Sequence, residues 1–191
     1  MNYPLGVKST EKKCINYGNR GMSLEYDLNE TNNYYLLQDI AVIYKKPTPI
    51  KIVDVDYPSR KEAVIKKAFF QIPSTTDYNG IYKGKYIDFE AKETTSSTSF
   101  PLANIHNHQI KHLQSIEKHG GIAFLIVRFT KLNKNFLLTI DKLSYFLDTS
   151  SKKSIDLKYF EEQGHLINEK YNPRLDYLSI IEKLYFKGEI K

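Results

Sequence analysis

The stretch that decides the fold runs from residue 74 to residue 95 and reads STTDYNGIYKGKYIDFEAKETT. Its second half alternates between apolar and charged residues, and successive side chains of a strand point to opposite faces of the sheet. The apolar residues share one face, which requires a core: Ile87, Phe89 and Ala91. The charged residues share the opposite face: Asp88, Glu90 and Lys92. This segment is therefore predicted to be a strand with a chemically active side.

The first half of the stretch can fold back on the second as a hairpin. A two-residue turn at Lys83-Gly84 would place Asp77 opposite Glu90 and Thr75 opposite Lys92, with directly opposed Cβ atoms about 5 Å apart. Two carboxylates at that distance repel unless a cation lies between them, and Mg²⁺ is a usual occupant of an all-oxygen site. Lys-Gly is a weaker turn than Asn-Gly, so a turn or bulge at residues 79–80 remains the alternative.

An acid followed by Glu-x-Lys is the pattern of PD-(D/E)xK nucleases, here with Thr-Asp in place of Pro-Asp. So short a pattern also occurs by chance on a solvated strand face. Further segments occur in order along the chain: NRGMSLE at 19–25, KPTP at 46–49, STTDYNG at 74–80, YIDFEAKET at 86–94, HQI at 108–110 and PRLDY at 173–177. Together they resemble the RecU family of bacterial Holliday junction resolvases, over nearly the whole chain from about residue 16.

The resemblance implies an α/β, restriction-endonuclease-like fold, with a mixed sheet flanked by helices and the site at the sheet edge. It implies one nuclease domain over residues 19–191, with a stalk insertion at about 45–74 that projects into the junction. Residues 1–18 are expected to form a flexible basic arm. The implied function is Mg²⁺-dependent resolution of junctions by paired nicks in recombination and repair, with Mn²⁺ able to substitute. The implied partners are four-way junction DNA, a second copy of the chain, the strand-exchange recombinase and the branch-migration machinery.

Five residues are assigned to the site. Asp77 and Glu90 would hold the metal, and Thr75 and Gln109 would complete its oxygen shell, a role that the resemblance implies by motif position. Lys92 supplies a point charge suited to stabilising the negative charge that develops at the phosphate. Gln109 lies in an apolar stripe, so a hydrogen bond in the core is the alternative reading, because a buried amide needs partners.

Two further acids have open roles. Asp88 shares the face of Glu90 and is a reserve metal ligand, although a solvated acid at the strand start is the preferred interpretation. Glu25, on the first helix, either faces the metal or is solvated or salt-bridged.

The composition is compatible with a DNA-binding enzyme. With 28 Lys and Arg against 22 Asp and Glu, the formal charge is +6 and the pI about 9.1, which favours a polyanionic partner without proving one. The basic excess is concentrated in the stalk, and the candidate DNA-binding residues are Arg20, Lys61, Lys66 and Lys67. The length fits one domain.

Cysteine use and hydropathy point to the cytoplasm. Cys14 is the one cysteine, so an internal disulfide and a thiolate metal cluster are excluded. The first twenty residues lack the apolar segment of a signal peptide. The longest apolar run, 122–127, is too short to cross a membrane.

Two other functions remain as alternatives: a restriction-type duplex endonuclease on the same fold, and a non-catalytic DNA-binding or annealing accessory protein. An HNH nuclease is rejected although residues 106–108 read HNH, because that chemistry needs a ββα metal finger. His106 and His108 are two residues apart on a predicted helix, so they are expected to point to different sides.

Spacing predicts the remaining elements. Helices are expected from an N-cap at Asn19 through residue 35, over 60–70, 102–118 and 141–147, from 154 to Gly164, and from Pro173 to near the end. Strands are expected at 39–44, 122–130 and 136–140, and a further extended segment from residue 50 to residues 57–58.

Overall fold

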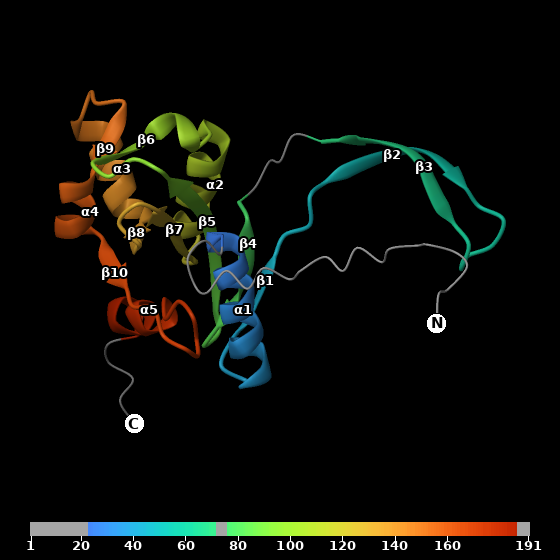
Figure 1. Ribbon diagram of the computed structural model, residues 1–191, viewed down its shortest axis with the longest axis horizontal. Helices are drawn as coiled ribbons and strands as arrows, with labels where there is room; N and C mark the ends of the chain where they lie inside the picture. The colour runs from blue at the N-terminus through green and yellow to red at the C-terminus, as the bar shows by residue number, and fades with distance from the viewer. Residues whose placement is uncertain (1–22, 72–75, 187–191) are drawn as a thin grey trace, which may run out of the picture.

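A six-stranded mixed sheet forms the centre of the computed structural model, which describes residues 23–71 and 76–186 (Figure 1). The strand order is β1 (Val42–Lys45), β4 (Tyr78–Tyr82), β5 (Lys85–Thr94), β7 (Ile122–Phe129), β8 (Lys134–Thr139) and β10 (His165–Ile167). Strands β5 and β7 run parallel, and the other neighbours in this sheet are antiparallel. The expected α/β architecture is confirmed.

Helices cover both faces of this sheet. On one side lie α1 (Leu24–Leu37) and α5 (Leu178–Tyr185), and on the other lie α2 (Asn107–Lys118), α3 (Ile140–Thr149) and α4 (Leu157–Gln163). Alternate residues of β7 enter the two cores, so Phe124 packs beneath α1 and α5 whereas Leu125 packs beneath α2 and α3. A strand buried on both faces has a continuous apolar sequence, which is why the run at 122–127 is recognisable as a strand.

The predicted hairpin is confirmed, with its turn at Lys83 and Gly84. Both residues have positive φ, 45° and 74°, as a two-residue turn between twisted strands requires. Tyr78 pairs with Phe89, which is the predicted register. The rings of these two residues stack with centroids 4.8 Å apart, and this packing supports the hairpin from the α1 side.

The alternative turn at residues 79–80 is wrong, because both residues lie inside β4. Gly80 is needed there for another reason. A Cβ on Gly80 would lie 2.0 Å from the carbonyl oxygen of Val42. The close approach of β1 therefore excludes any side chain at this position.

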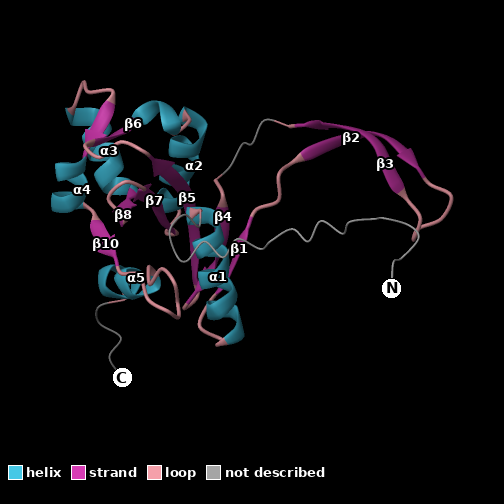
Figure 2. Cartoon of the chain, viewed as in Figure 1, coloured by secondary structure: helices cyan, strands magenta, loops and turns pink. Residues whose placement is uncertain are grey.

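The insertion is a two-stranded antiparallel ribbon that extends away from the body (Figure 2). It consists of β2 (Ile50–Asp56) and β3 (Val64–Phe70), and the residues of both strands are exposed. The helix expected over 60–70 is therefore wrong. β-branched and aromatic residues favour strands, and the pairing with β2, from Ile50 opposite Phe70 to Asp56 opposite Val64, outweighs the helical spacing.

Two predicted helix starts are also wrong. The N-cap of α1 is Ser23, whose hydroxyl accepts the N–H of Tyr26 at 3.2 Å; Asn19 and the predicted basic arm lie outside the described residues. The last helix begins at Leu178 rather than at Pro173. The segment between them is held by α1 instead, since the Leu175 N–H donates to the Thr31 hydroxyl at 2.9 Å.

Two more helices begin later than expected. Residues Leu102–Asn104 form a separate 3-10 turn before α2. Residues Ser154–Asp156 form β9, which pairs with β6 (Ser99–Pro101) before α4 starts. Phe100 and Ile155, opposite each other in this pair, are fully buried, so core packing selects the strand there.

Among the residues that the structure describes, no helix combines the length and the apolar character that a membrane span requires.

Candidate active site

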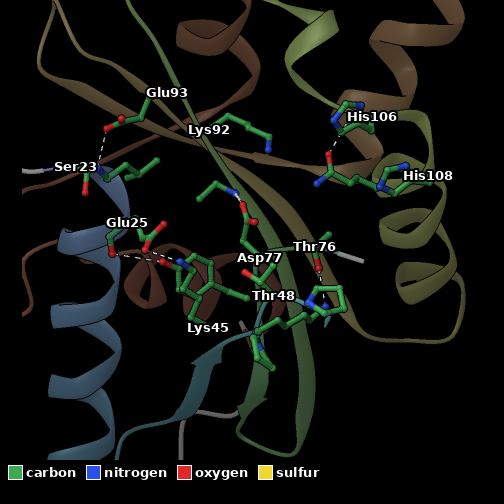
Figure 3. Close-up of a pocket in the computed structure, with 17 residues that line it drawn as sticks. Ser23, Glu25, Lys45, Thr48, Thr76, Asp77, Lys92, Glu93, His106 and His108 are labelled. Carbon is green, nitrogen blue, oxygen red and sulfur yellow. Dashed lines mark hydrogen bonds and ion pairs between the residues drawn. The ribbon is translucent and has the colours of Figure 1, made fainter. Parts of the chain in front are cut away.

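A cavity of about 790 Å³ lies where five parts of the chain meet (Figure 3). Its walls are the start of α1, the end of β5, the start of α2 and the two feet of the ribbon, which we define as residues 45–49 and 76–78. Asp77 and Lys92 line it directly. The cavity therefore joins the predicted acidic hairpin to the base of the ribbon.

Asp77 and Glu90 hold each other in place through the backbone. The Asp77 N–H donates to Glu90 Oε2 at 3.1 Å, and the Ala91 N–H donates to Asp77 Oδ2 at 3.2 Å. Each carboxylate thus accepts a backbone N–H from the segment that carries the other acid. The two acids lie opposite each other, as the hairpin register predicts.

Glu90 is fully buried at the floor of the site. Lys92 Nζ lies 2.5 Å from its Oε1, and the Gln109 amide nitrogen donates to the same oxygen at 2.7 Å. Burial, together with the nearby charge of Asp77, raises the pKa of Glu90 to about 7 against the opposing effect of Lys92. An ionised buried carboxylate is costly unless it is paired, so this face favours additional positive charge.

The donor chemistry fits a hard divalent cation at Asp77 and Glu90. Among the residues that the structure describes, no three His, Cys, Asp or Glu side chains form a group that could hold a metal, so other oxygen donors would have to complete the shell. Thr75 lies outside the described residues. Gln109 is in place, but its Oε1 accepts the His106 N–H at 3.0 Å, and it would offer an oxygen only after its amide rotated.

Asp88 is not the solvated acid that the sequence favoured. It is fully buried, because α2 and the ribbon feet cover this part of β5. Its carboxylate contacts Lys46, Tyr86 and His112 at 2.8, 3.0 and 3.2 Å, and it accepts the Thr76 hydroxyl. Protein donors therefore occupy both of its oxygens.

Glu25 is salt-bridged and lines the cavity. Its Oε1 lies 2.5 Å from Lys45 Nζ, and both side chains are exposed (Figure 3). An exposed pair of this kind adds little stability. The pair instead places one positive and one negative charge at the mouth of the cavity.

His106 and His108 lie side by side, with rings stacked at 5.4 Å and 10° between their planes, and both line the cavity (Figure 3). The prediction that they point to different sides is wrong, because His106 is the extended residue before α2 rather than part of the helix. Sequence reasoning missed their place in the cavity, as it missed Lys46 and Thr76. The one available signal was proximity in sequence to Gln109 and Asp77.

The candidate DNA-binding lysines lie on the ribbon. Lys61 is in the turn at its tip. Lys66 pairs with Asp56 at 2.9 Å, and the ammonium of Lys67 lies 5.4 Å from the ring centroid of Phe69. Arg20 lies outside the described residues.

Comparison with known proteins identifies the family. Residues 19–183 match the model of the family RecU: Recombination protein U. The chain belongs to the RecU family. It is 58% identical to the Holliday junction resolvase RecU of Geobacillus sp., over 97% of this chain and 98% of that relative. It is 55% identical to the RecU of Pediococcus pentosaceus, over 96% and 97% of the two chains.

A looser likeness links this RecU chain to a solved structure. The 1.6 Å structure of Archaeoglobus fulgidus Hjc, a Holliday junction resolvase, aligns with a TM-score of 0.44 and 12% identity, covering 74% of this chain and 92% of that one.

Proposed function

We propose that this chain is a structure-selective endonuclease that resolves Holliday junctions by paired nicks during recombination and repair. Membership of the RecU family supports the substrate class. The observation that carries the chemistry is that Asp77 and Lys92 line one cavity and both contact the buried Glu90 carboxylate. The position of that cavity, at the base of an exposed basic ribbon, suits a branched DNA.

Within this proposal, Asp77 and Glu90 would hold Mg²⁺, and Mn²⁺ would be able to substitute for it. A bound ion of this kind neutralises charge on the scissile phosphate and generates hydroxide at neutral pH. The chain supplies the preorganisation, because the backbone N–H groups of Asp77 and Ala91 fix both carboxylates before any ligand arrives. Lys92 presents its ammonium beside Glu90, where it would stabilise negative charge on the phosphate.

The ribbon would supply structure selectivity. Its two strands have both faces exposed, so it can occupy the open centre of a four-way junction while its lysines contact phosphates. Two opposed DNA strands must be nicked, and a two-fold dimer supplies two sites with matching symmetry.

We expect the enzyme to act in the cytoplasm, with the strand-exchange recombinase and the branch-migration machinery as further partners.

The test is cleavage of a synthetic four-way junction and of the matched linear duplex, each with Mg²⁺, Mn²⁺, Ca²⁺ or EDTA. We expect paired nicks in the junction with Mg²⁺ or Mn²⁺, and none in the duplex. Equal cutting of duplex would indicate the restriction-type alternative. Junction binding without cutting in any metal would indicate the accessory protein.

A further inference from the structure

A buried polar cluster surrounds Asp88, next to the site but outside the chemistry proposed for it. Asp88 lies in β5, two residues before Glu90 and on the same face, and is fully buried. A buried carboxylate is retained at a cost unless charged and polar partners surround it. The identity of those partners indicates its role.

Two of the partners come from the two feet of the ribbon. On the outgoing foot, Lys46 Nζ lies 2.8 Å from Asp88 Oδ2. On the returning foot, the Thr76 hydroxyl donates to Asp88 Oδ1. The feet also contact each other, since Lys46 Nζ donates to the Thr76 hydroxyl at 2.8 Å and the Lys46 N–H donates to the Asp77 carbonyl at 2.7 Å. One carboxylate thus joins both feet to β5, the catalytic strand that carries Glu90 and Lys92.

The other two partners belong to the body. The Tyr86 hydroxyl donates to Asp88 Oδ2 at 3.0 Å, and His112 Nε2 of α2 lies 3.2 Å from the same oxygen. They come from the strand that carries Asp88 and from the helix packed over it, so neither reaches the ribbon. Asp88 therefore has partners of two kinds, which substitutions can separate.

We propose that Asp88 is a positioning residue that clamps both feet of the ribbon to the catalytic strand. The clamp holds Thr76, and with it the adjacent Asp77, in the place where Asp77 opposes Glu90. It also fixes the direction in which the ribbon leaves the body, and therefore the place where a junction held by the ribbon meets the acids. This inference rests on the proposed nuclease function, because the clamp acts on alignment and does not touch the substrate.

Cleavage kinetics on a four-way junction test the clamp through Asp88→Asn, Lys46→Met and the double variant. Each single change should lower kcat by about 10-fold or more, because small misplacements of reacting groups are costly, while KM for the junction changes by less than about threefold. Nicks should spread to neighbouring phosphates. The double variant should be no worse than the more affected single one, as expected for residues that act together. Additive losses would mean that Lys46, which also lines the cavity, acts on DNA directly, and would overturn the clamp.

Tyr86→Phe and His112→Gln are the matched controls, because they change the body-side partners of Asp88 and leave Lys46 and Thr76 in place; Tyr86→Phe also removes the hydrogen bond from the Asn79 amide of β4. We expect both to keep wild-type kcat and nick positions. If they lose as much activity as Lys46→Met, the cluster serves fold stability in general and the proposal is wrong.

Amide hydrogen exchange separates failure of the clamp from failure of the nuclease assignment. Asp88→Asn should speed exchange at the amides of Lys46 and Asp77, whether or not the wild-type protein cuts junctions, because local opening follows the loss of buried contacts. The amides of β7 should be unchanged. Unchanged exchange at both feet would overturn the clamp even for an active enzyme.

Discussion

Asp77 and Glu90 occupy a part of the sheet where the neighbouring strand β7 carries an apolar core residue. Leu125 of β7 is opposite Glu90 and is buried beneath α2 and α3. The acids keep this place because backbone N–H groups, Lys92 and the Gln109 amide satisfy them. Residues held in this way can be changed to isosteric amides with little loss of packing.

The acids themselves give the first prediction. Asp77→Asn and Glu90→Gln should each weaken Mg²⁺ binding and lower the cleavage rate by about 10²-fold or more, since one of the two carboxylates that would hold the ion becomes a neutral amide. Junction binding should persist, because it depends on cationic contacts to phosphates. The measurement is junction nicking in Mg²⁺ beside a gel shift in Ca²⁺. Asp148→Asn, an exposed acid on α3, is the control. Wild-type cutting by either site variant would refute the assignment.

Lys92 should behave differently from the acids. Lys92→Ala should still bind Mg²⁺ but cut slowly, by about 10²-fold or more if the ammonium stabilises the transition state. The comparison is metal affinity, measured by calorimetry, with the single-turnover rate. Loss of metal binding in step with loss of rate would show that Lys92 only maintains the site.

The pKa of Glu90 leads to a prediction on pH. Because burial and Asp77 raise that pKa to about 7, the folded metal-free protein binds this proton more tightly than the unfolded chain, whose carboxyl has its usual value near 4.5. The stabilisation of the fold by this bound proton is complete below the unfolded-state pKa, and it is lost as the pH rises through the folded-state pKa of about 7. In EDTA, the Tm of the wild type should therefore fall relative to that of Glu90→Gln between pH 5.5 and pH 8.

Mg²⁺ should reverse that trend, since it binds the ionised carboxylate. Saturating Mg²⁺ should raise the wild-type Tm more at pH 8 than at pH 6, and should have little effect on Glu90→Gln. Parallel Tm profiles of the two proteins, with and without the ion, would contradict both the raised pKa and the metal site.

At the scale of elements, the ribbon can be altered without disturbing the body, because its residues are exposed along both strands. Replacing residues 53–67 with Asn-Gly would join the paired ends, Ile52 and Ala68, through a favourable two-residue turn. This variant should keep its Tm but lose preference for four-way junctions over duplex in competition gel shifts. A folded short-ribbon variant with the parental preference would refute the selectivity role.

A full-length ribbon with Lys61, Lys66 and Lys67 changed to Gln separates charge from shape. Each lost phosphate contact should reduce the magnitude of the slope of log K against log[salt] by about 0.9, where K is the association constant for the junction. If the shape of the ribbon determines selectivity, this variant should keep the preference of the unchanged chain for the four-way junction over duplex.

At the scale of the whole molecule, we predict a homodimer. The described part of each chain holds one candidate site, and paired nicks need two sites in two-fold symmetry. Sedimentation at micromolar concentration should show the dimer. A mixed dimer of wild type and Asp77→Asn, isolated by two different tags, should nick one strand of each junction. Symmetric cutting by a chain that remains monomeric would contradict this prediction.

The local sequence was enough to predict the hairpin of β4 and β5 and the face on which its acids lie. Alternation in 85–94, together with a turn whose glycine tolerates positive φ, determines which residues of β5 share a face and which residue of β4 each one meets. The same holds for β7, whose continuous apolar run can be satisfied only by burial on both faces. These effects act within a few residues along the chain, so they can be read without knowing the rest of the molecule.

Tertiary structure decided what depends on distant partners. The ribbon strand β3 has both faces exposed, so it lacks the alternation that identifies a strand, and pairing with β2 selects its conformation. Asp88 has the sequence context of a solvated acid, yet Lys46, 42 residues earlier, and His112, 24 residues later, surround it. His106 and His108 meet because the first of them stays extended before α2. Burial of a charge depends on which segments pack over it, and that is a property of the folded chain.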